Sequence, residues 1–176
     1  MTQPWVLMTR EERLALLLSA WRTAIPALLI LGSMLIMVLP VFLPGPTLPH
    51  LPLLGVYYWS THRPNLLPAW AAFLIGLAVD IVLGMPLGLN ALLFVLVRAG
   101  LGSQITAFLA RPYIFGLAVA APVILLFQVM TWTLLLPFEP RIGLTPFLVQ
   151  AATTLAAWPL MTRLCALAQT RLVDKW

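Results

Sequence analysis

Charged residues are scarce in this sequence, and cysteine is almost absent. Only 9% of the 176 residues are charged, 62% are hydrophobic, and Cys165 is the single cysteine. Ordinary soluble domains carry roughly a quarter charged residues, and a chain this short has too much surface for its volume to bury so large an apolar fraction. Lipid is therefore the expected solvent. One cysteine also excludes an intramolecular disulfide framework and a multi-cysteine metal site.

Motifs for catalysis or cofactor binding are missing as well. The sequence contains no HExxH, GxSxG, Walker A or GxGxxG pattern and no acidic cluster. His50 and His62 are expected on opposite sides of the membrane, where they cannot share a metal. The ten cationic residues are scattered singly, unlike the basic stripe of a nucleic-acid-binding surface. We therefore predict no enzyme activity, cofactor, metal or nucleic-acid partner.

Long apolar segments are what the sequence has in abundance. A membrane-spanning helix needs about 20 mostly apolar residues to cross a hydrocarbon core of about 30 Å. The predicted spans are residues 24–43, 48–61, 66–83, 86–103, 113–136 and 144–164. The second would cover only about 21 Å, so its length leaves the crossing undecided. The fourth includes Arg98, whose guanidinium is expected to snorkel to the headgroups.

The placement of cationic residues resolves the second segment, because arginine and lysine accumulate on the cytoplasmic side. If all six segments cross and the N-terminus is cytoplasmic, nine of the ten cationic residues lie inside and only Arg141 lies outside. If the second segment merely dips into the membrane, six of them lie outside. The sequence thus predicts an all-α integral membrane protein: one domain over residues 1–176, with six transmembrane helices and both termini in the cytoplasm.

Residues 1–23 are expected to form a cytoplasmic or interfacial segment. Thr9 and Glu12 have the spacing of a capping box, and apolar residues follow at helical spacing. This predicts a short helix on the membrane surface, at a large angle to the first span. The alternative is a cytoplasmic extension of the first span, and the sequence leaves both open.

Several aromatic and polar side chains are expected to have structural roles. The tyrosines and tryptophans near the span ends should lie at the headgroup level. Gln128, Thr131 and Thr133 in the fifth span are expected to bond a neighbouring helix, with a ligand as the alternative. The aromatic residues concerned are Trp5, Trp21, Tyr57, Tyr58, Trp59, Trp70, Tyr113 and Trp176.

Asp80 is the one acidic residue expected at membrane depth, where a carboxylate costs at least about 2.5 to 3.5 kcal/mol. It lies about one turn before the end of the third span, and Gly84 and Pro86 then form a tight turn into the fourth. Asn90 follows at matching depth, so its amide is expected to donate to the Asp80 carboxylate. Gly76, Gly84 and Gly88 are expected to let the two backbones approach closely.

Two interpretations of Asp80 remain open. In the structural one, the carboxylate caps the turn by accepting N–H bonds from the start of the fourth span. Asp80→Asn should then be mild and Asp80→Leu worse, because leucine strands the donors of the turn. In the functional one, Asp80 belongs to a binding surface or to a proton- or cation-sensitive site.

Two stretches carry a resemblance to a known family. Residues Leu53–Trp59 read LLGVYYW and residues Asp80–Ala91 read DIVLGMPLGLNA. Together with the length and the six apolar segments, they resemble the rod shape-determining protein MreD family. The resemblance covers essentially the whole chain, although only residues 53–91 are motif-like. The hairpin residues that match the family pattern are Asp80, Gly84, Pro86, Gly88 and Asn90.

The resemblance implies a non-enzymatic component of the lateral cell-wall elongation complex in the bacterial inner membrane. Proteins of this family work as scaffolds beside MreC, the filament protein MreB, and RodA with its partner class B penicillin-binding protein. The family pattern assigns no chemistry to the hairpin residues. The family is also similar in architecture to the substrate-binding subunits of energy-coupling-factor transporters. A small-solute-binding membrane subunit of a transporter is therefore the alternative function.

Overall fold

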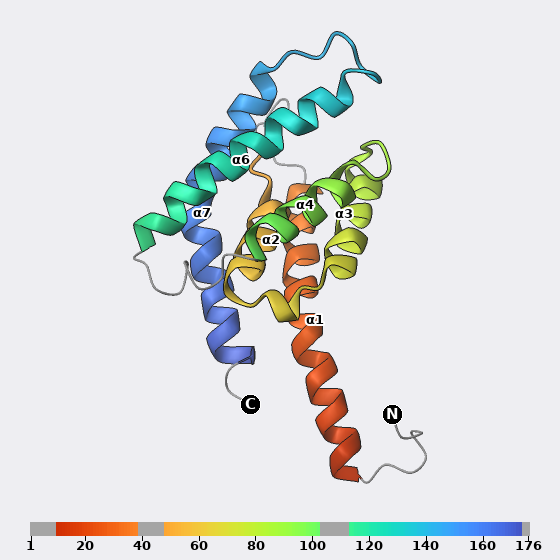
Figure 1. The fold of residues 1–176 in the computed structure, drawn as a ribbon, viewed down its shortest axis with the longest axis vertical. Helices are drawn as coiled ribbons and strands as arrows, with labels where there is room; N and C mark the ends of the chain where they lie inside the picture. The colour runs from red at the N-terminus through yellow and green to blue at the C-terminus, as the bar shows by residue number, and fades with distance from the viewer. Residues whose placement is uncertain (1–9, 39–47, 103–112, 174–176) are drawn as a thin grey trace.

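The computed structural model describes residues 10–38, 48–102 and 113–173, and this part of the chain is all helical (Figure 1). Each predicted span overlaps one of its helices, so the all-α class is confirmed. The α-helices are α1 (Arg10–Val38), α2 (Leu51–His62), α3 (Ala69–Leu83), α4 (Leu89–Gly102), α6 (Tyr113–Leu135) and α7 (Thr145–Ala168). A 3-10 turn, η2 (Pro64–Leu66), precedes α3, and a π-helical turn, η3 (Gln169–Val173), extends α7.

The helices differ in their capacity to cross a membrane alone. Residues Phe115–Leu135, within α6, are the one helix in the described ranges that is long and apolar enough to do so. Three further apolar stretches are shorter, namely Ala24–Met37, Ala69–Leu83 and Leu89–Leu101. The count of six crossings thus stays a prediction.

The N-terminal segment differs from the surface helix that the sequence predicts. Residues Arg10–Val38 form one continuous helix that contains Pro26, and its N-terminal part projects beyond the bundle (Figure 1). The structure therefore agrees with the alternative, in which this segment extends the first span. The prediction of a separate helix at a large angle is wrong. Thr9 lies outside the described residues. Proline is tolerated here because neighbouring groups can satisfy the freed carbonyl.

Helix α2 occupies the centre of the bundle. It packs against α1, α4 and α7, and all residues from Pro52 to Thr61 are buried. Tyr57 and Trp59 are 2% and 0% exposed, so these aromatic side chains pack against protein, and their predicted position at the headgroup level stays a prediction. Trp21 and Trp70, by contrast, are exposed. An enclosed helix needs no lipid-facing stripe, and this accounts for apolar or aromatic residues on every face of α2.

Helices α6 and α7 form a long antiparallel pair beside the α1–α4 part of the bundle (Figure 1). Tyr57 of α2 donates a hydrogen bond to the Gly116 carbonyl of α6 at 2.7 Å. Tyr58 of α2 donates to Oε1 of Gln169, just beyond α7, at 2.9 Å. The two tyrosine hydroxyls therefore connect the central helix to the C-terminal pair.

Candidate functional site

The Asp80 carboxylate, fully buried at the C-terminal end of α3, caps the N-terminus of α4. Its Oδ1 accepts from the Asn90 main-chain N–H at 2.9 Å and from Asn90 Nδ2 at 2.8 Å. Its Oδ2 accepts from the N–H of Gly88 at 2.9 Å and of Ala91 at 3.4 Å. The predicted bond from the Asn90 amide to Asp80 is confirmed. Because the first N–H groups of a helix lack intrahelical partners, the carboxylate supplies acceptors that α4 would otherwise lack.

The turn between α3 and α4 depends on two glycines with positive φ. Gly84 ends α3 with φ of 66°, and the Met85 N–H donates to the Asp80 carbonyl at 2.9 Å. Gly88 has φ of 97° immediately before α4, a conformation that only glycine adopts readily. A Cβ at either position would meet no atom within 4 Å. These two glycines therefore set backbone conformation, and the expectation that they allow close approach is wrong for both.

Close approach of the two helices occurs at Gly76 instead. A Cβ at Gly76 would lie 2.6 Å from the Ala91 nitrogen and 2.7 Å from the Asn90 carbonyl carbon. No side chain fits at such distances, so α3 and α4 pack backbone to backbone here. This contact holds Asp80, one turn further along α3, beside the N–H groups of α4.

A second group of polar contacts joins the start of α2 to α7. The buried His50 donates its main-chain N–H to Thr154 Oγ1 at 2.8 Å, and its Nδ1 accepts from the Leu53 N–H at 3.4 Å. Its ring packs edge-on against Phe94 and Phe127 at centroid distances of 6.0 and 5.1 Å. His50 and His62 lie at opposite ends of α2, and their location on opposite sides of the membrane stays a prediction.

The polar side chains of α6 do not form the hydrogen bonds to a neighbouring helix that the sequence predicts. Thr131 and Thr133 donate to Phe127 and Met130 in their own helix, so the interhelical bonds predicted for them are wrong. Gln128 is 1% exposed, and neither its Nε2 nor its Oε1 has a partner within the described part of the chain. A buried amide without partners is destabilising by about 1 to 3 kcal/mol.

Arg98 is a structural residue whose role the sequence does not reveal. Its Nε donates to the Leu67 carbonyl at 2.6 Å, and its Nη2 donates to the Pro64 carbonyl at 2.8 Å. Both carbonyls belong to the connection between α2 and α3. This bidentate clamp fastens the connection to α4, and the snorkelling of Arg98 to the headgroups stays a prediction.

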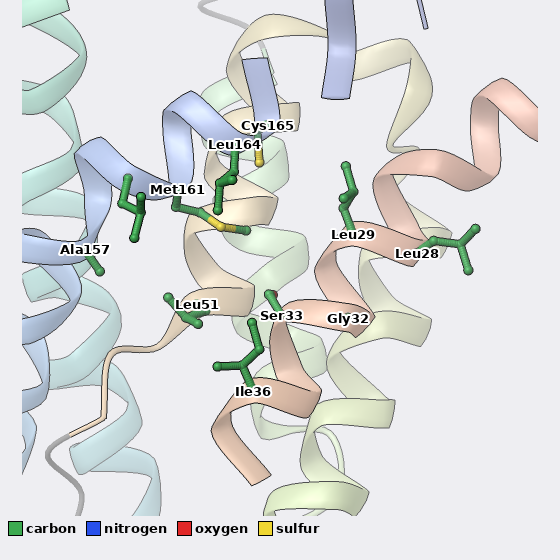
Figure 2. A pocket seen from close by; sticks show the side chains of 11 residues that line it. Leu28, Leu29, Gly32, Ser33, Ile36, Leu51, Ala157, Met161, Leu164 and Cys165 are labelled. Atoms are coloured by element: carbon green, nitrogen blue, oxygen red, sulfur yellow. The ribbon is translucent and has the colours of Figure 1, made fainter. Parts of the chain in front are cut away.

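Between α1 and α7 lies an apolar groove of about 440 Å³ (Figure 2). Leu28, Gly32 and Ile36 line it from α1, Met161 and Cys165 line it from α7, and Leu51 of α2 also contributes. Figure 2 shows Leu164 and Cys165 toward one end of the groove and Ile36 toward the other. Hydropathy alone could not reveal this groove, because it depends on which helices are neighbours.

The polar groups of the hairpin, of the α2–α7 contact and of the Arg98 clamp stabilise the fold. In the residues that the structure covers, no group of three or more His, Cys, Asp or Glu side chains could hold a metal ion. Both oxygens of Asp80 are committed to hydrogen bonds within the hairpin. Fold and site together define an all-helical protein whose strongest polar contacts fix one helix against another.

Comparison with known protein families agrees with an all-helical, membrane-associated protein. The family model for rod shape-determining protein MreD matches residues 17–166. That range covers most of the 176 residues, and the chain belongs to the MreD family. No curated protein and no solved structure matches it. Membership indicates a role in rod-shape determination for a membrane-associated protein.

Proposed function

We propose that this chain is a non-enzymatic, multi-pass component of the bacterial inner membrane that scaffolds lateral wall elongation. The family match over residues 17–166 is the observation that carries the proposal. Shape determination in rods requires wall synthesis along the side of the cell. A membrane-embedded scaffold would hold the synthetic enzymes in place for that process.

The distribution of polar groups supports a scaffold. Asp80, Arg98 and Tyr57 each direct their polar atoms at backbone or side-chain groups of another helix or connection. Large apolar side chains lie on the outside, among them Trp70 and Leu160, each 65% exposed. Rigid internal contacts with an apolar exterior suit a protein that binds other helices within lipid.

The proposed topology has six crossings and both termini in the cytoplasm. The nine-to-one distribution of cationic residues supports it. Helix α2 has 12 residues, a length of about 18 Å at 1.5 Å per residue. Its enclosure by α1, α4 and α7 supports a crossing of this length, because protein surrounds it and the bilayer need not match it.

The proposed partners are MreC, MreB, and RodA with its class B penicillin-binding protein. MreC, as a single-span periplasmic scaffold, would bind through its transmembrane helix. The hairpin of Asp80, Gly84, Pro86, Gly88 and Asn90 is a candidate interaction element. Its cap keeps the turn in one conformation, which lowers the entropy lost when a partner binds.

Replacement of the resident family member in a rod-shaped bacterium tests this function. Cells depleted of their own protein should round up, and expression of this chain together with its cognate MreC should restore rods. Affinity purification in mild detergent should recover MreC and RodA. Cells that stay round despite normal membrane abundance, together with a co-purifying small solute identified by mass spectrometry, would instead favour the transporter-subunit alternative.

A further inference from the structure

The groove between α1 and α7 is open along its rim and closed at its base. Leu28 and Leu160 at the rim are 53% and 65% exposed, whereas Met161 and Cys165 are buried. The volume of about 440 Å³ lies within the range of roughly 300 to 1,000 Å³ that ligand sites occupy. The groove is therefore large enough for a ligand, and its open rim makes it accessible from the side.

The lining of the groove is suited to hydrocarbon. The hydroxyl of Ser33 donates to the Ile30 carbonyl of its own helix at 2.7 Å. Apart from this occupied hydroxyl and the buried Cys165 thiol, the lining consists of aliphatic side chains, Met161 and Gly32. A polar solute would lose its hydration without gaining a partner. An acyl chain would bury its methylenes at no such cost.

The length of the groove distinguishes an acyl chain from a partner helix. Its walls extend from Leu28 to Ile36 on α1 and from Ala157 to Cys165 on α7. Each wall is eight residue steps long, or about 12 Å at 1.5 Å per residue. One leaflet of a bilayer has a hydrocarbon depth of about 15 Å, half of the ~30 Å that a partner helix would span. The groove thus matches one leaflet.

Arg163 directly precedes the lining residue Leu164 in α7, near the end of the groove marked by Leu164 and Cys165, and is not itself a lining residue. Arg163 is exposed and stands between the lining residues Leu160 and Leu164, and Arg171 is exposed further along the same end of the chain. Of the carboxylates with described side chains, Asp80 is bonded within the hairpin and Glu139 precedes α7 at its other end. Within the described residues, therefore, no carboxylate pairs with Arg163, and a phosphate is a suitable partner for its charge.

From this apolar groove and its cationic end, we infer that the site binds an anionic phospholipid. The acyl chain lies between α1 and α7, and the phosphate lies beside Arg163. The inference rests on the membrane insertion that belongs to the proposed function. The lipid would also fill the space between two helices that would otherwise leave a gap.

Native mass spectrometry of the full chain tests the site, after release from nanodiscs with equal amounts of phosphatidylglycerol and phosphatidylethanolamine. The wild-type chain should retain phosphatidylglycerol about fivefold over phosphatidylethanolamine, the ratio for about 1 kcal/mol from one cation near an anionic lipid. Arg163→Gln should bring this ratio close to one. The matched control is Arg141→Gln, an exposed arginine before the opposite end of α7, and it should keep the wild-type ratio.

A second variant fills the groove itself. A Cβ at Gly32 would meet no atom within 4 Å, so Gly32→Leu adds a side chain without displacing a neighbour. Retention of both lipids should fall several-fold. Gly100→Leu is the control, since Gly100 is also helical, exposed and without an atom within 4 Å of its Cβ position. Both leucine variants should keep the helix content of the wild type by circular dichroism.

Three results would overturn the inference. Equal retention of the two lipids by the wild-type chain would show annular lipid only. Unchanged retention in Gly32→Leu would place the bound lipid elsewhere. Failure of the chain to co-float with vesicles would show that it does not insert into membranes, and would contradict both this site and the proposed function. The first two results would contradict the lipid site alone and would not affect the proposed function.

Discussion

Asn90 donates two hydrogen bonds to one oxygen of Asp80, from its main-chain N–H at 2.9 Å and from its side-chain Nδ2 at 2.8 Å. The other oxygen of Asp80 accepts from Gly88 and Ala91. Two helices are thereby joined by one side chain that has no spare acceptor oxygen. The structural interpretation of Asp80 accounts for all four of these contacts.

The destabilisation caused by a substitution at Asp80 should increase with the number of hydrogen-bond acceptors that it removes. Asp80→Asn keeps one oxygen but turns an NH₂ group toward N–H donors, so it should destabilise the protein by about 1 to 3 kcal/mol. The structure thus makes this change costlier than the mild effect that the sequence predicts. Asp80→Leu leaves all four donors without the carboxylate and should cost more. Thermal unfolding in detergent, followed by circular dichroism, measures the order.

The same pair of variants separates structure from function in cells. If Asp80 acts through structure, loss of rod shape should parallel loss of protein from the membrane, with Asp80→Leu worse. Equal loss of shape at normal abundance in both variants would instead show that Asp80 is a working site, because abundance would no longer explain the phenotype.

Gly76→Ala should destabilise the hairpin, because its methyl group would overlap the backbone of Asn90 and Ala91. Overpacking of this kind costs about 1 to 3 kcal/mol. Gly100→Ala, in the neighbouring α4, is the control, since its methyl group meets nothing within 4 Å. It should be neutral or stabilising by up to about 1 kcal/mol, because alanine is the better helix former. Equal unfolding temperatures for the two variants would contradict the close contact between α3 and α4.

Arg98→Met should release the connection between α2 and α3. It removes both hydrogen bonds from the guanidinium to the Leu67 and Pro64 carbonyls, and bonds to charged groups contribute about 1.5 to 3 kcal/mol. Arg98→Lys should recover part of the loss, because an ammonium keeps the charge without the planar fork. Limited proteolysis between residues 62 and 69 reports the release. Cleavage at the wild-type rate in both variants would argue against the clamp.

Cysteine labelling tests the topology in a Cys165→Ser background. A cysteine at the exposed Asn65 should react only with reagents that reach the cytoplasm. A cysteine at the exposed Gly143 should react from the periplasm, because the α6–α7 connection lies outside in the six-crossing topology. Periplasmic labelling at position 65 would mean that α2 does not cross, and the six-crossing topology would then fail.

The features predicted from the sequence are those with local causes. Helix positions follow from apolar runs, and the Asp80–Asn90 pair follows from a turn short enough to bring positions ten residues apart to the same depth. The enclosure of Tyr57, the clamp by Arg98 and the groove beside Gly32 depend on which helices become neighbours. Hydropathy is similar on every face of such helices, so it does not reveal their packing order.

The central position of α2 has a consequence for biogenesis. Two of its anchors come from the end of the chain: Thr154 accepts the His50 N–H, and Gln169 accepts the Tyr58 hydroxyl. During synthesis, α2 emerges about a hundred residues before these partners exist. The second helix to leave the ribosome is therefore among the last to reach its native surroundings, and the nascent protein must shield this short, hydroxyl-bearing segment until α7 arrives.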